Sequence, residues 1–79
     1  GREMAGCFEL GALHEAGRGV RQDYDRAADL YREACEDRHG EACARVATLF
    51  QKGAGVPRDS GAAARYEQKA CRAGHAPSC

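Results

Sequence analysis

The sequence contains no tryptophan, isoleucine or asparagine, and alanine supplies much of its 43% hydrophobic content. Its formal net charge at pH 7 is zero, so no electrostatic argument favours nucleic acid or an acidic membrane surface as a partner. No apolar run reaches the ~18 residues of a membrane-spanning helix, so we expect no membrane insertion. A chain of 79 residues buries too little apolar surface to be comfortably stable on its core alone. Its five cysteines fit a need for additional cross-links.

The cysteine spacing repeats along the chain. Residues 35–43 and residues 71–79 both read Cys-x3-His-x3-Cys, and the second copy lies 36 residues after the first. The same offset aligns further identical residues, among them Cys7/Cys43, Leu13/Leu49, Gly17/Gly53, Gly19/Gly55, Val20/Val56, Asp23/Asp59 and Ala27/Ala63. A fixed period of ~20–50 residues is the mark of a repeat protein.

The repeating unit is predicted to be a pair of helices. Apolar residues recur with a 3.6-residue period, Asp23 and Asp59 are suitable N-caps, and Gly17 suits a left-handed C-cap. The expected helices are 3–16, 26–35, 40–52 and one that follows Asp59. We therefore predict an all-α fold, an α/α superhelix (solenoid) formed by one domain over residues 1–79. Its parts are repeat one (4–39), repeat two (40–75) and the first turn of a third repeat (76–79).

Repeat one reads Leu10-Gly11-x2-His14-x2-Gly17-x-Gly19-Val20-x2-Asp23-x3-Ala27-x2-Leu30-Tyr31-x2-Ala34-Cys35. This pattern resembles the Sel-like repeat, a relative of the tetratricopeptide repeat, and the paired cysteines resemble its secreted, cysteine-rich Hcp-type branch. The resemblance implies antiparallel helix pairs in a right-handed superhelix that acts in protein–protein contact. It also implies an alternative function, since some Hcp-type members are β-lactam-binding or weakly β-lactamase-like. Repeat two has Val46-Ala47 where Leu-Gly is usual, and we expect a looser helix contact there.

The cysteines are predicted to form disulfides. Cys35 and Cys43 lie at the end of one helix and the start of the next, and Cys71 and Cys79 repeat this arrangement. A short turn of this kind could bring the paired Cα atoms into the disulfide range of roughly 4.4–6.8 Å. Disulfides would place the protein in an oxidising compartment, secreted, periplasmic or in a mitochondrial intermembrane space. Cys7 is equivalent to Cys43 and its partner would precede the chain, so we expect a free thiol at Cys7 and a longer repeat array.

Zinc is the alternative use of the same residues, because cysteine and histidine are its preferred ligands. Each Cys-x3-His-x3-Cys set supplies three ligands, whereas structural zinc favours four, so we predict no metal and no cofactor. His39 and His75 are instead expected to satisfy backbone groups of the turns with their ring nitrogens.

No catalytic arrangement is apparent in the sequence. The two serines, Ser60 and Ser78, do not begin the Ser-x2-Lys motif that serine β-lactamases use. We therefore predict that the protein is not an enzyme and has no catalytic residues.

The predicted function is binding of a protein or peptide by a disulfide-stapled monomer. If the first helix of each pair lines the concave side, as in related repeats, its non-core positions are the binding candidates. These positions are Phe8, Glu9, Ala12, Glu15, Arg45, Thr48, Gln51 and Lys52. Phe8 is predicted to be an exposed aromatic anchor, with contact to an upstream repeat as the alternative.

Overall fold

The protein is a small helical array. The structure, a computed structural model, describes residues 2–75, with side chains from residue 6 onwards. Four α-helices are present in this range: α1 (Arg2–Ala16), α2 (Tyr24–Glu36), α3 (Gly40–Lys52) and α4 (Ser60–Arg72). The predicted all-α solenoid fold is confirmed for these residues. The predicted start of a third repeat, at 76–79, lies outside them.

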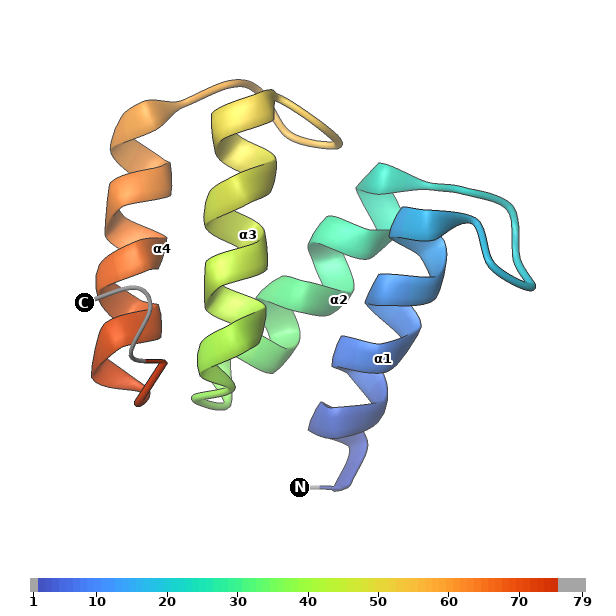
Figure 1. Cartoon of the computed structure of the whole chain (residues 1–79), viewed down its shortest axis with the longest axis horizontal. Helices are drawn as coiled ribbons and strands as arrows, with labels where there is room; N and C mark the ends of the chain where they lie inside the picture. Colours follow the sequence, from blue (N-terminus) through green and yellow to red (C-terminus); the bar gives the residue numbers. More distant parts are fainter. Residues whose placement is uncertain (1, 76–79) are drawn as a thin grey trace.

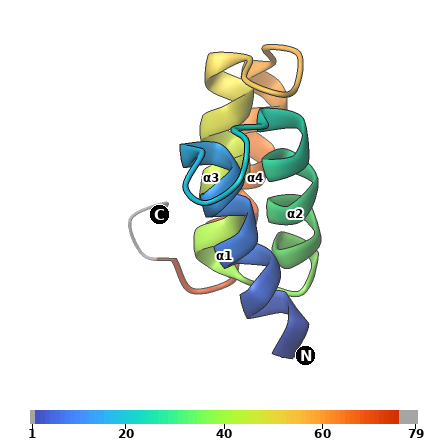
Figure 2. The same ribbon diagram turned by 90° about the vertical axis from the view of Figure 1, so that its right-hand side faces the viewer.

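The helices follow one another in space as they do in sequence (Figure 1). Each helix packs against the next, so α2 contacts both α1 and α3. Seen from the side, α1 and α3 lie towards one face of the molecule, and α2 and α4 lie towards the other (Figure 2). The array therefore has an α1/α3 layer and an α2/α4 layer, and α2 and α3 join the two repeats.

Local capping accounts for where the helices begin. The carboxylates of Asp23 and Asp59 accept hydrogen bonds from the backbone N–H of Arg26 and Ala62, each at 3.1 Å. Both caps were predicted, and both satisfy donors that a helix N-terminus otherwise leaves without a partner. At the C-terminus of α3, Gly53 has the left-handed conformation (φ 73°) that favours glycine.

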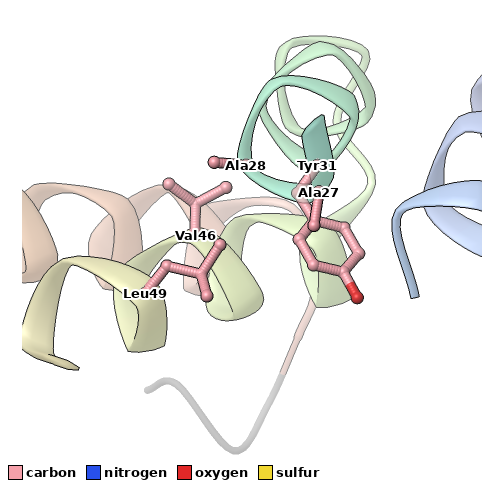
Figure 3. Close-up of a cluster of buried hydrophobic side chains, with 5 residues drawn as sticks. All are labelled: Ala27, Ala28, Tyr31, Val46 and Leu49. Carbon is pink, nitrogen blue, oxygen red and sulfur yellow. The ribbon is translucent and has the colours of Figure 1, made fainter. Parts of the chain in front are cut away.

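The core lies mainly between α2 and α3. Ala27, Ala28 and Tyr31 of α2 pack with Val46 and Leu49 of α3 (Figure 3), and all five are buried. The small alanine side chains leave room for α3 to approach α2 closely. Full burial of a valine or leucine side chain stabilises the folded state by about 1.5–3 kcal/mol, so this cluster is the main apolar link between the repeats.

The two repeats differ at Gly11, whose equivalent in repeat two is Ala47. A Cβ atom at Gly11 would lie 2.9 Å from the ring of Tyr31, so this contact between α1 and α2 requires glycine. The prediction of a looser contact at Val46-Ala47 is wrong, because both residues are completely buried. In repeat two the position equivalent to Tyr31 is Glu67, which is exposed, so no equivalent aromatic ring excludes a methyl group at Ala47.

The outer side of α1 is less well covered than that of α3. Leu10 and Leu13 are 36% and 40% exposed, whereas their repeat equivalents Val46 and Leu49 are 0% and 1% exposed. The difference arises because α3 lies against α2 of the preceding repeat, and the described residues provide no such helix for α1.

Candidate protein-binding surface

A row of polar side chains runs from the core to the α1/α3 surface. Tyr31 is completely buried, and its hydroxyl donates a 2.7 Å hydrogen bond to Glu15 Oε1 on α1. The same carboxylate oxygen lies 3.7 Å from a guanidinium nitrogen of Arg45 on α3. Arg45 also lies 3.9 Å from Glu41, one helical turn earlier. We call Tyr31, Glu15, Arg45 and Glu41 the polar row.

Electrostatics explain the state of Tyr31. Burial, the hydrogen bond to Glu15 and the negative charge of that carboxylate raise the pKa of Tyr31 above its ordinary value. Tyr31 therefore keeps its proton and acts as the donor to Glu15. In the sequence, Tyr31 stands out only as part of the repeat pattern. The signal for its second role was the phenolic hydroxyl, since a buried tyrosine usually finds a polar partner.

Arg45 is the member of the polar row that links the two repeats and remains accessible. Its side chain is 45% exposed, compared with 51% for Glu41 and 23% for Glu15. Ion pairs at this degree of exposure contribute little to stability, roughly 0–1 kcal/mol. The arrangement therefore orients the guanidinium more than it stabilises the fold.

Phe8 is placed differently from the prediction. Its ring stacks on His39 with the centroids 4.5 Å apart, and it lies 5.5 Å from the ring of Tyr31. Phe8 is partly buried and packs against both parts of the core. Phe8 is therefore less exposed than the anchor interpretation expects, and its role as a contact residue stays a prediction. Neither predicted alternative involved a contact within the chain itself.

The other candidate positions divide by exposure. Ala12 packs against the core, and Thr48 donates a 3.1 Å hydrogen bond to the carbonyl oxygen of Ala44 one turn earlier. Glu9, Gln51 and Lys52 are exposed. All five remain predictions as contact residues, and Ala12 and Thr48 are only partly exposed.

The first cysteine pair forms a disulfide. Cys35 and Cys43 are linked, and their Cα atoms lie 4.6 Å apart. Cys7 carries a thiol whose sulfur lies 3.7 Å from Glu33 Oε1, to which it donates a hydrogen bond. The second predicted disulfide, Cys71–Cys79, lies outside the described residues because Cys79 is not among them.

The histidine of the first cysteine set has a structural role. His39 is the N-cap of α3, and its Nδ1 accepts a 3.2 Å hydrogen bond from the backbone N–H of Ala42. This is the predicted use of its ring. Among the side chains of residues 6–75, no three histidine, cysteine or acidic groups gather as a metal site would require.

The comparisons with known proteins agree with this architecture. The Sel1 repeat family model matches residues 5–39 and 40–75. The chain belongs to the Sel1 repeat family. Sel1 repeats mediate protein–protein interaction and are generally scaffolds and not enzymes. No curated protein sequence matches the chain significantly.

Three solved structures of Sel1-type proteins resemble the chain closely. Cysteine-rich protein B (HcpB) of Helicobacter pylori is 32% identical with a TM-score of 0.92, over 96% of this chain and 57% of HcpB. A Sel1 repeat protein from Oxalobacter formigenes is 25% identical with a TM-score of 0.90, over 95% of this chain and 31% of the other. The protective antigen c5321 of uropathogenic Escherichia coli, described as having an SLR fold, is 25% identical with a TM-score of 0.86. The match covers 90% of this chain and 15% of the antigen. The chain thus spans less than two thirds of each relative.

The described helices carry no membrane span. Within residues 2–75, every helix is too short or too polar to cross a bilayer.

Proposed function

We propose that this Sel1 repeat chain binds a protein or peptide partner through the α1/α3 surface, with Arg45 as the central contact. The observation that supports this proposal is the position of Arg45 between the repeats. It belongs to repeat two, it is oriented by Glu15 of repeat one, and its guanidinium remains partly exposed. Arginine on a shared helical surface is a frequent energetic centre of protein interfaces.

The charges on this surface indicate the chemistry of the partner. Glu9 on α1 is exposed and acidic, whereas its repeat equivalent on α3 is Arg45. Gln51 and Lys52 are exposed at the far end of α3. The surface therefore changes from acidic on α1 to basic on α3, which suits an extended peptide that carries both signs of charge.

We also propose that the protein works in an oxidising compartment, either secreted or periplasmic. The Cys35–Cys43 disulfide supports this, because such bonds form and persist outside reducing cytosol. The similarity to HcpB, whose name describes it as cysteine-rich, points in the same direction.

A peptide array containing mixed-charge sequences, followed by fluorescence anisotropy of the best binder, would test the binding proposal. Arg45→Ala should weaken binding by about tenfold, which corresponds to ~1.4 kcal/mol. Arg32→Ala is the matched control, since Arg32 is exposed on α2 in the other layer. Equal binding by Arg45→Ala and the wild type, or an equal loss in Arg32→Ala, would show that this surface is not the site.

The β-lactam-binding alternative gains no support from the described residues. Ser60 is exposed and is the first residue of α4, which is a position for helix initiation. Ser78 lies outside the described residues. No second function is therefore proposed.

A further inference from the structure

A basic pocket lies in the other layer of the molecule, away from the α1/α3 surface. The C-terminal ends of α2 and α4 both contribute to its lining, and its volume is about 480 Å³. The lining residues come from these ends and from the turn after α2: Cys35, Glu36, Arg38, Lys69, Arg72 and Ala73. Cys35, which is linked to Cys43 by the disulfide, thus forms part of its wall.

The charge of this pocket is unbalanced. Among the described lining residues, Arg38, Lys69 and Arg72 contribute three positive charges, and Glu36 is the only carboxylate. Among residues 2–75, neither Arg38 nor Arg72 forms an ion pair within 4.0 Å. A neighbouring pocket along α2 has two arginines against three carboxylates, so the positive excess is local. Two guanidinium groups are therefore available to an anion from solution.

The backbone at Arg38 supplies a second, independent observation. Arg38 has φ 66°, and it is the only residue other than glycine with a positive φ in the described range. The equivalent residue of repeat two is Gly74, with φ 94°. Glycine adopts this conformation without steric cost, whereas arginine does not. The turn itself therefore does not require a side chain at this position.

Helix electrostatics explain only part of the basic cluster. Lys69 and Arg72 lie in the last turn of α4, where positive charge complements the helix dipole. The last turn of α2 carries no basic residue, and Arg38 follows it in the disfavoured conformation. The ammonium of Lys69 also lies 5.0 Å from the centroid of the Tyr66 ring, which limits its freedom to move. The pocket is thus partly ordered before any ligand binds.

We propose that this pocket binds carboxylate side chains of an acidic segment in a partner protein, with Arg38 and Arg72 as the principal contacts. Guanidinium groups pair with carboxylates through two parallel hydrogen bonds, which gives both affinity and orientation. The volume is within the roughly 300–1,000 Å³ of ligand sites, which is more than one small inorganic ion fills. The site is formed by α2 and α4 and does not depend on binding at the α1/α3 surface.

Fluorescence anisotropy with a fluorescein-labelled hexaglutamate peptide at low salt tests this assignment. Arg38→Gly is the decisive variant, because it installs the residue that repeat two already has at this position. We expect the variant to bind the peptide about tenfold more weakly than the wild type and to melt at the same or a higher temperature. Arg65→Ala, which removes an exposed cation of α4 outside the pocket lining, should bind within about twofold of the wild type.

Three outcomes would overturn the proposal. The first is an absence of peptide binding by the wild type. The second is an equal loss of affinity in Arg38→Gly and Arg65→Ala, which would indicate a general effect of net charge. The third is displacement of the peptide by inorganic phosphate at concentrations as low as those of unlabelled hexaglutamate, which would indicate a simple anion site. A loss confined to Arg38→Gly, with weak competition by phosphate, supports the proposal.

Discussion

The side chain of Tyr31 has two roles, because its ring packs in the core and its hydroxyl donates a hydrogen bond. Its ring fills the space between α1, α2 and α3, against Gly11 and Phe8, and its hydroxyl reaches Glu15. Replacing a hydroxyl whose partner is a charged carboxylate removes a hydrogen bond of about 1.5–3 kcal/mol. This residue therefore couples the stability of the core to the position of the proposed binding surface.

The raised pKa of Tyr31 predicts a loss of stability at alkaline pH. In the unfolded chain a tyrosine ionises near its ordinary pKa of about 10, whereas the folded protein retains the proton to higher pH. Above about pH 10 the unfolded state binds fewer protons than the folded state, so the stability of the folded state falls as the pH rises. The contribution of Tyr31 is therefore present in full below about pH 10 and is lost above it. Urea unfolding of the wild type should therefore show a steeper fall between about pH 10 and 12 than that of Tyr31→Phe.

Glu15→Gln provides a control for the alkaline effect. The glutamine can still accept the hydrogen bond but carries no charge, so its alkaline loss should lie between those of the wild type and Tyr31→Phe. Identical pH profiles for all three proteins would mean that Tyr31 does not carry the effect.

At the scale of the helices, the contact between α1 and α2 depends on one glycine. A methyl group at position 11 would meet the ring of Tyr31 at 2.9 Å. Gly11→Ala should therefore destabilise the protein by about 1–3 kcal/mol, although alanine is the better helix former. Gly6→Ala is the matched control on the same helix, because nothing lies within 4 Å of its added Cβ. This control should stabilise by roughly 0.5–1 kcal/mol, and a loss of similar size in both variants would refute the packing argument.

The connection from α2 to α3 depends on the Cys35–Cys43 disulfide. The bond closes a loop with a sequence separation of eight, which the chain-entropy relation converts to about 2.5 kcal/mol of stabilisation. Replacing both residues by serine should lower the free energy of unfolding by this order in urea titrations. Further destabilisation of the double variant by a reducing agent would report the predicted Cys71–Cys79 bond. Unchanged stability of the double variant would contradict the stapling role.

The sequence predicted the helices well because their signals are local. The cap residues Asp23 and Asp59 act on amides three residues away, and the helical period is visible within one helix. The stacking of Phe8 was not predicted because its partner His39 is distant in the sequence and its repeat equivalent is Ala44, which gives no hint of stacking. The conformation of Arg38 was not predicted because arginine rarely adopts a positive φ, and the only sequence signal was its alignment with Gly74 in repeat two.

At the scale of the whole molecule, stability is unevenly distributed along the array. Helices α2 and α3 each have neighbours on two sides, whereas α1 and α4 each pack against one of them. The cluster of Ala27, Tyr31, Val46 and Leu49 lies between the two inner helices and is completely or almost completely buried. The outer helices are therefore expected to open before the centre does.

Native-state hydrogen exchange can measure this gradient. Amides in the middle of α2 and α3 should exchange most slowly, with free energies near that of global unfolding, and those of α1 should exchange faster. The exposed Leu10 and Leu13 are the physical reason for the weaker protection of α1. Equal protection of all four helices would instead indicate a fully cooperative unit.

The position of the disulfide has a consequence for proteolysis. Because the bond joins Cys35 to Cys43, it spans the whole connection between the repeats, including the exposed Arg38. A trypsin-like protease that cuts after Arg38 would break the main chain without separating the two helix pairs. The nicked protein would keep its buried α2–α3 contact and run as one species on a non-reducing gel. Exposure to trypsin-like proteases would thus leave the array assembled as long as the bond remains oxidised.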